Sequence, residues 1–259
     1  MVVKLRLQVA LAKLGFASRR SAVELIQAGR VKVNGENALF PSERVDLEKD
    51  KITVDGQSSF VSARVYCLLN KPKDVVCTVK DKYAGRTVID IVGKRDTRIY
   101  PVGRLDKDTT GLLLLTNDGE LAFRLTHPKF GIVKIYHVCV SGCVNRSKIG
   151  QLEQGIILEG KRTYPCKIGI IKQQKKETTL EVCLTEGRKR QIKKMFMAVG
   201  HPVLAIQRTA FGPLKLANLE EGRWRALSSQ EVARLKQLCR LKTGGEGTEK
   251  EQAECGNNN

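Results

Sequence analysis

Residues 103–119 read GRLDKDTTGLLLLTNDG, and this stretch decides the fold. Its second half contains four consecutive leucines, Leu112 to Leu115, between a glycine and an Asn-Asp-Gly turn. A short apolar run between turn signals predicts a strand that is buried on both sides. Its first half is a polar loop that carries Asp106 and Asp108. The stretch therefore predicts a candidate functional loop leading directly into a buried strand.

Two kinds of site use aspartates in a similar spacing, and the context of Asp106 argues against both. Asp106, Asp108 and Thr110 match the D-x-D-x-T of aspartate-based phosphohydrolases, but there the first aspartate ends a hydrophobic strand, whereas Gly-Arg-Leu precedes it here. An EF-hand calcium loop begins similarly, but its twelfth position is a bidentate glutamate, and here that position is Asn117. We therefore expect neither phosphohydrolase activity nor a calcium site.

The same loop is similar to the signature G-R-L-D-x-x-[ST]-x-G of pseudouridine synthases. Other motifs of that family follow in order along residues 64–239: Lys71–Pro72, the K-x-Y of Lys134 and Tyr136, EGRKRQIKKMF at 186–196, RTAFGPLKL and GRWRALSSQEVARL. The resemblance implies an α+β catalytic domain with a mixed, largely antiparallel sheet. It also implies an isomerase that turns a uridine of RNA into its carbon-linked isomer.

The helix, cap and hairpin patterns within the first 35 residues indicate a separate unit. Residues 5–14 predict a helix with Leu5, Val9, Ala12 and Leu14 near one face, and Ser18 is placed to cap a second helix. Asn34–Gly35 predicts a tight hairpin.

Residues 6–35 resemble the αL RNA-binding module of the ribosomal protein S-four type. Joined to the catalytic domain, this module makes the chain similar to the RsuA/RluB group, which modifies ribosomal RNA. The organisation implies an RNA-binding domain over residues 1–62, a catalytic domain over 63–242 and a disordered tail over 243–259. Residues 57–63 are expected to form a linker.

The resemblance implies roles for residues of the catalytic domain. Asp106 would be the nucleophile, and the sequence does not decide whether it attacks the sugar or the base. Tyr136 would stack on the target uracil, and Leu184 would pack on its other side. Lys193, where many members have arginine, would pair with Asp106 and keep it ionised. Arg104 would fill the gap left by the flipped base.

Basic side chains outside the pocket are expected to bind the RNA backbone. The chain has 46 Lys and Arg against 27 Asp and Glu, and a net charge of +19 attracts a polyanion. The alternative is a basic surface that only aids solubility. The expected phosphate-binding residues are Arg19, Arg20 and Arg30 in the N-terminal unit, and Arg188, Lys189, Arg190 and Lys194 in the catalytic domain.

Ribosomal RNA is the expected partner, with the large-subunit 23S RNA favoured over the small-subunit 16S RNA. No cofactor is expected, since the reaction needs none and neither G-x-G-x-x-G after a strand nor G-x-x-x-x-G-K-[ST] occurs. The eight cysteines form no C-x-x-C, which argues against a zinc site. No apolar run is long enough for a membrane span, so we expect a cytoplasmic monomer without a membrane partner.

A rival interpretation from another class is a non-catalytic RNA-binding or ribosome-assembly protein that has kept the fold. Three departures from the family pattern favour it: Val9, Asp74 where glycine is usual, and Lys193. The intact Asp106 and Tyr136 favour the enzyme.

Overall fold

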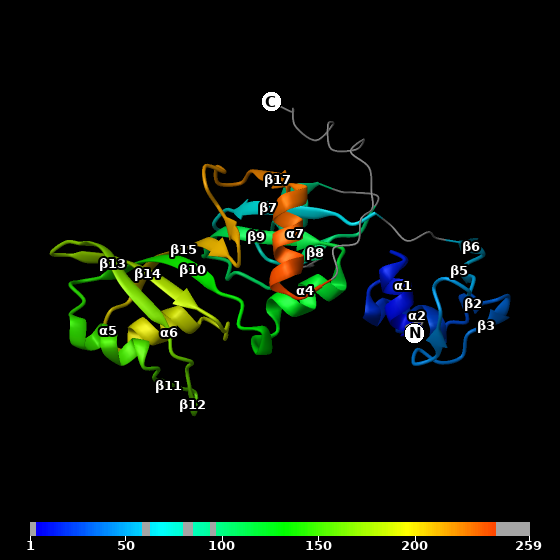
Figure 1. The fold of residues 1–259 in the computed structure, drawn as a ribbon, viewed down its shortest axis with the longest axis horizontal. Coiled ribbons are helices and arrows are strands. Elements are labelled where there is room, and N and C mark those ends of the chain that lie inside the picture. Colours follow the sequence, from blue (N-terminus) through cyan, green and yellow to red (C-terminus); the bar gives the residue numbers. More distant parts are fainter. Residues whose placement is uncertain (1–3, 59–62, 80–84, 94–96, 242–259) are drawn as a thin grey trace. The chain divides into compact units, whose positions relative to one another are not determined.

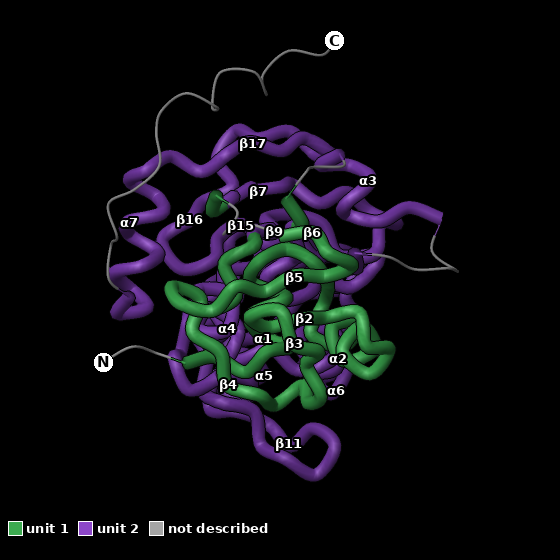
Figure 2. Tube along the Cα trace, turned by 90° about the vertical axis from the view of Figure 1, so that its right-hand side faces the viewer, with its two compact units in different colours: residues 1–64, 95–98, 117–119 green, residues 65–94, 99–116, 120–259 purple. Residues whose placement is uncertain are grey.

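The structure is a computed structural model that describes residues 4–58, 63–79, 85–93 and 97–241 (Figure 1). The chain divides into two compact units, coloured separately in Figure 2. One comprises residues 1–64, 95–98 and 117–119, and the other comprises 65–94, 99–116 and 120–259. The tail expected over 243–259 lies outside the described residues. The two units are described separately below.

The N-terminal unit combines two helices with short strands. A four-stranded antiparallel sheet has the order β3-β2-β5-β6, and β1 pairs with β4. Asn34 and Gly35 both have positive φ and connect β2 to β3, which confirms the predicted hairpin. The elements are α1 (Leu7–Lys13), α2 (Arg19–Gln27), β1 (Leu5–Arg6), β2 (Val31–Val33), β3 (Glu36–Asn37), β4 (Arg44–Val45), β5 (Ile52–Val54) and β6 (Gln57–Ser58).

Two expectations for this unit are wrong. Leu5 pairs with Val45 of β4, so α1 begins two residues later than expected; its buried residues are Leu7, Ala10 and Leu11, and of the predicted face only Leu14 is buried. The expected linker also begins too early, because Gln57–Ser58 pairs with β5. In both cases a partner distant in sequence decides where the local element begins or ends.

The second unit is built on one large mixed sheet, as expected. Its strands follow the order β13-β14-β10-β15-β9-β7-β17, with β16 on β15 and β8 on β9. Its elements are β7 (Tyr66–Lys71), α3 (Val88–Val92), β8 (Tyr100–Pro101), β9 (Thr110–Thr116), α4 (Gly119–Thr126), the 3-10 turn η1 (Pro128–Phe130), β10 (Lys134–Ser141), α5 (Arg146–Glu153), β11 (Ile157–Leu158), β12 (Lys161–Arg162), β13 (Lys167–Gln173), β14 (Glu177–Leu184), α6 (Gln191–Ala198), β15 (Val203–Phe211), β16 (Leu214–Lys215), β17 (Trp224–Ala226) and α7 (Ser229–Leu238).

β9 is the buried central strand that the sequence predicts. Leu112 and Leu114 face the core covered by α4 and α7, while Leu113 and Leu115 face the core shared with α3, and all four are fully buried. A third core joins β10 and β14 to α5 and α6. The pairing of β9 with β15 is parallel, whereas the other pairings of this sheet are antiparallel within the described residues.

Helix patterning in this unit is largely confirmed. α6 buries Ile192, Met195 and Phe196, as the spacing predicts. Val199, at the C-cap of the helix, is buried beside them. The capping box of Ser228 opens α7, but the helix ends at Leu238 rather than near residue 242. No helix in the described part of the chain is long and apolar enough to cross a membrane.

Candidate active site

Asp106 lies in the loop between β8 and β9. Its side chain is half-buried, while the preceding Leu105 is buried in the core shared with α3. The Thr109 N–H donates to the Asp106 carbonyl (3.0 Å) and closes a turn around the aspartate. The Asp106 carboxylate makes no hydrogen bond or ion pair with the residues that the structure describes. The loop therefore presents a carboxylate that is held in place but not neutralised.

Residues 71–77 hold the main chain on both sides of Asp106. Before it, the Leu105 N–H donates to the Cys77 sulfur (3.3 Å), and burial raises the pKa of that thiol, so it stays neutral. After it, the Lys107 carbonyl accepts from the Asp74 N–H (2.9 Å) and from the Lys71 ammonium (3.2 Å). The Lys-Pro motif and the catalytic signature, distant in sequence, are thus parts of one loop assembly.

The two residues that bond to the Lys107 carbonyl, Lys71 and Asp74, are both in unfavourable environments or conformations. Lys71 is fully buried, and its burial lowers the pKa of its ammonium. Asp74 has φ +63°, in the left-handed region where glycine has no steric penalty. Its departure from the glycine usual in the family therefore has a conformational cost, while its N–H still makes the required hydrogen bond.

A close approach of two strands fixes the point where the loop enters β9. Gly111 has φ +105°, and a Cβ added there would lie 2.3 Å from the Arg208 carbonyl oxygen on β15. Arg208 is almost completely buried, and its Nε donates to the Leu112 carbonyl (2.7 Å). Only glycine allows the parallel pair to form at this distance.

Lys193 reaches the loop from the first turn of α6, but its partner differs from the one expected. Its ammonium pairs with Asp108, two residues beyond Asp106. This hydrogen bond holds the pKa of the Asp108 carboxyl below its usual range. The expectation that Lys193 pairs with Asp106 is therefore wrong for this structure, although the lysine does lie at the loop that carries Asp106.

Tyr136 occupies the middle of the sheet on β10. It lies opposite Arg208 of β15 and packs against the core that contains Leu105 and against the core that contains Leu184. The cores therefore bring Tyr136 near both the aspartate loop and the end of β14. Arg104, by contrast, is exposed on the loop itself.

A half-buried lysine and a buried arginine beside Tyr136 were not predicted as site residues. The Lys134 ammonium donates to the Ile132 carbonyl (2.9 Å) and the Thr185 carbonyl (3.4 Å), and partial burial together with the charge of Arg208 lowers its pKa to about 8. The guanidinium of Arg208 lies over the Phe211 ring, 5.0 Å from its centroid. The K-x-Y motif is visible in the sequence, but nothing local indicates that Lys134 lies half-buried beside an arginine.

Arg188 makes hydrogen bonds within the protein, whereas it was expected to lie on a phosphate-binding surface. Its guanidinium donates to Glu186 (2.9 Å), to the Lys161 carbonyl (2.9 Å) and to the Arg162 carbonyl. These bonds fasten the β11–β12 hairpin to the segment before α6, so the prediction that Arg188 binds phosphate is not supported by this geometry.

The neighbouring basic residues differ among themselves. Lys194 pairs with Glu159 at 2.5 Å, whereas Lys189 and Arg190 are exposed. Arg190 has φ +55° at the position before α6 begins. Two of the four expected phosphate contacts are therefore presented to solvent.

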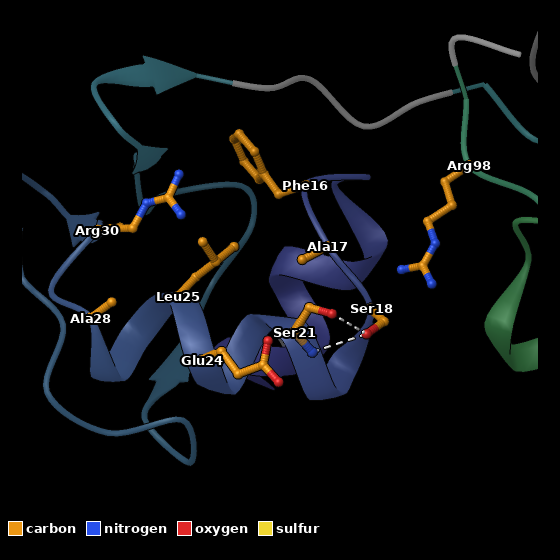
Figure 3. A pocket seen from close by; sticks show the side chains of 9 residues that line it. All are labelled: Phe16, Ala17, Ser18, Ser21, Glu24, Leu25, Ala28, Arg30 and Arg98. Atoms are coloured by element: carbon orange, nitrogen blue, oxygen red, sulfur yellow. Dashed lines mark hydrogen bonds between the residues drawn. The ribbon is translucent and has the colours of Figure 1, made fainter. Parts of the chain in front are cut away.

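In the N-terminal unit, Ser18 caps α2 as predicted. Its Oγ accepts from the Ser21 N–H (2.9 Å), as Figure 3 shows beside a pocket that Arg30 also lines. Arg19 and Arg20 occupy the exposed first turn of α2. Arg30 is already paired with Asp55, so the three expected phosphate contacts are not equivalent.

Comparisons with known proteins agree with this architecture. The RNA pseudouridylate synthase family matches residues 65–198, and the S4 domain family matches residues 5–52. A Bacillus subtilis (strain 168) relative named ribosomal large subunit pseudouridine synthase B is 43% identical over 90% of this chain and 96% of its own length.

Two further proteins extend the match. An Aquifex aeolicus (strain VF5) relative, described as an uncharacterized RNA pseudouridine synthase, is 40% identical over 93% of this chain and 97% of its own. A crystal structure of a pseudouridylate synthase is 32% identical, has a TM-score of 0.65, and covers 89% of this chain and 99% of its own. The loop geometry and these matches together show that the chain belongs to the RNA pseudouridine synthases, isomerases acting on RNA, with an S4 domain at its N-terminus.

Proposed function

We propose that this enzyme isomerises a specific uridine of large-subunit (23S) ribosomal RNA. The observation that carries the proposal is the match to the Bacillus subtilis protein named for the large ribosomal subunit, which spans both units of the chain. The shared N-terminal unit matters because it supplies RNA contacts outside the catalytic domain. A relative that shared the catalytic domain alone would support the reaction but not the substrate.

Asp106 is the nucleophile of the proposed reaction. A nucleophilic carboxylate must be ionised and unoccupied, and the Asp106 carboxylate has no partner among the described residues. The bonds from Lys71, Asp74 and Cys77 to the neighbouring main chain limit its movement. Such fixing lowers the entropic cost of bringing the carboxylate to the uridine.

The bonds of the isomerisation balance without a further reactant. The glycosidic bond from the sugar to nitrogen 1 of uracil breaks, and a bond from the same sugar carbon to carbon 5 forms. Carbon 5 then loses its hydrogen as a proton, and nitrogen 1 gains one. Loss of the hydrogen from carbon 5 is therefore a direct measure of turnover.

The uracil binds between Tyr136 and Leu184 in this proposal. Both side chains pack in the core of β10 and β14, and Leu184 ends the strand that pairs with β10. A stacked uridine hides the bond that breaks, so the base must leave its helix. Arg104, exposed two residues before Asp106, occupies the vacated position and contacts the RNA backbone.

Lys193 keeps its proposed place in the catalytic machinery through Asp108. The Lys193 ammonium pairs with the Asp108 carboxylate and so places a positive charge at the loop that carries Asp106. The N-terminal unit acts as an anchor, because Arg19 and Arg20 face solvent and raise the local concentration of RNA at the catalytic domain.

The test uses ribosomal RNA from a strain that lacks this protein, labelled with tritium at carbon 5 of uridine. The wild-type enzyme should release tritium from 23S RNA, and modification mapping should find one new pseudouridine there. Asp106→Asn should abolish release while RNA affinity stays within about threefold, since affinity rests on the basic surface. Release from 16S RNA alone would overturn the substrate assignment. Retention of a tenth of wild-type turnover by Asp106→Asn would overturn the role of Asp106.

A further inference from the structure

An exposed aromatic cluster lies where α4 passes into η1. The ring centroids of Phe123 and His127 are 5.1 Å apart, and those of Phe123 and Phe130 are 6.1 Å apart at 83°. Phe123 is 51% exposed, although Leu121 and Leu125 of the same helix are fully buried. We call this cluster the aromatic surface; it consists of Phe123, His127, Lys129 and Phe130. Its Phe123 ring is a large apolar group in contact with water.

One cation of this surface is available to a ligand. The Lys129 ammonium lies 4.8 Å from the Phe130 centroid and 5.7 Å from that of Phe123, and it pairs with no carboxylate in the described part of the chain. Arg124, in contrast, is committed to the Cys239 carbonyl (2.7 Å) and to Glu120 (2.8 Å). Lys129 therefore supplies a positive charge beside the exposed ring of Phe123.

The backbone of the cluster is held rigidly. The His127 Nδ1 accepts from the Lys129 N–H (3.2 Å), and the His127 carbonyl accepts from the Phe130 N–H (3.1 Å). Phe130 packs against the core beneath, and Gly131 ends the turn at φ +59°. A rigid aromatic surface loses little entropy when it binds, which favours its use in recognition.

The surface adjoins the catalytic loop. Thr126, the last residue of α4, has its methyl carbon 3.5 Å from the point where a Cβ on Gly103 would lie. Gly103 opens the loop that carries Arg104 and Asp106, and His127 follows Thr126 directly. An RNA strand whose uridine reaches Asp106 therefore passes beside this cluster.

We propose that the aromatic surface binds the substrate RNA next to the target uridine, with an unpaired base stacked on Phe123 and the adjoining phosphate on Lys129. Every base offers a π-face, so exposed aromatic rings bind unpaired RNA with little sequence preference. Paired bases stack on one another and have no face to offer. The inference rests on the proposed function, because it takes the ligand to be the substrate of the neighbouring loop.

The experiment measures binding of the full-length protein to two fluorescent probes, an RNA hairpin with an unpaired loop and a blunt RNA duplex of equal length. Phe123→Ala should weaken hairpin binding about 5-fold or more and change duplex binding by less than twofold. Phe123→Trp should restore hairpin binding. Ile171→Ala is the matched control, since Ile171 is also 51% exposed but lies on the edge strand β13.

Lys129→Gln provides a second, independent variant. It should make the slope of log affinity against log salt concentration shallower by about 0.7 for the hairpin, the value for one phosphate of a single strand. Lys175→Gln, in the exposed β13–β14 turn, is the control and should leave the difference between the hairpin and duplex slopes unchanged. Equal loss on hairpin and duplex, or hairpin binding unchanged in both Phe123→Ala and Lys129→Gln, would overturn the inference. A protein that releases no tritium from any ribosomal RNA but shows the predicted hairpin pattern would refute the proposed function alone.

Discussion

Replacing Gly111 with alanine tests the parallel pairing of β9 with β15 in the catalytic sheet. The new Cβ would lie 2.3 Å from the Arg208 carbonyl oxygen and 2.6 Å from its nitrogen. Both are backbone atoms of a buried strand, so no side-chain rotation can relieve the contact. β9 and β15 must separate, and their parallel pairing spans only Gln207 with Thr110 and Arg208 with Gly111.

The cost has two parts that can be worked out separately. Holding an alanine at φ +105° costs about 1–2 kcal/mol in backbone energy. Forcing a methyl group into a packed joint costs about 1–3 kcal/mol more. We expect the free energy of unfolding of the catalytic unit to fall by about 2–5 kcal/mol, which moves a urea midpoint by about 1–2.5 M at a slope of about 2 kcal/mol per M.

Trp224 makes the measurement selective. It is the single tryptophan of the chain and lies on β17 of the catalytic unit, so its fluorescence reports unfolding of that unit. Gly160→Ala is the matched control, because Gly160 has φ +76° and no atom within 4 Å of the added Cβ. The control should show the backbone cost alone, about 1–2 kcal/mol. Equal midpoint shifts for the two variants would refute the argument that strand contact requires Gly111.

The remaining predictions concern charge and domain organisation. Lys193→Met should let the pKa of the Asp108 carboxyl rise toward its usual value, which carboxyl NMR can follow. The Asp108 side chain is 48% exposed, so solvent screens the pair; its stabilisation should be under about 1 kcal/mol at pH 7 and should disappear as the pH falls through the folded pKa of Asp108. The pKa of Lys134 is lower in the folded than in the unfolded protein, so the unfolded state binds more protons between about pH 8 and pH 10. The urea midpoint of the wild type should therefore rise over this range, and Lys134→Met should flatten that rise. Deleting residues 1–62 should leave a folded catalytic domain with weaker RNA binding and a flatter salt dependence; an unchanged slope would contradict the anchoring role of Arg19 and Arg20.

The elements that the sequence predicts well are those determined by neighbours in the chain. The leucine run of β9, the Asn34–Gly35 hairpin and the cap at Ser228 depend on residues within one turn or one strand, and the structure contains all three. The start of α1 depends instead on Leu5 pairing with Val45, forty residues away. Periodicity alone cannot reveal that pairing, so the predicted inner face matches the buried residues only at Leu14.

The same distinction explains the errors at the site. Lys193 could meet either of two aspartates in one loop, and the turn closed by Thr109 decides which one lies in reach. Arg188 belongs to a basic run typical of phosphate contacts, yet its acceptors are main-chain carbonyls of a hairpin more than twenty residues earlier. Charge patterns in sequence show which residues are basic, but only tertiary contacts show which charges are already satisfied.

Strain and unsatisfied polarity gather around the loop of Asp106. Asp74 has a positive φ, Lys71 is fully buried, and a terminal nitrogen of Arg208 is buried without a hydrogen-bond partner among the described residues. An unpaired buried donor costs about 1–3 kcal/mol, and backbone strain in a non-glycine residue costs a similar amount. All three residues bond to, or pair with, the loop or the first residues of β9. A sheet selected for stability alone would distribute such costs or remove them. Such costs cluster at functional sites, so their concentration beside this loop agrees with the proposal that Asp106 is the nucleophile.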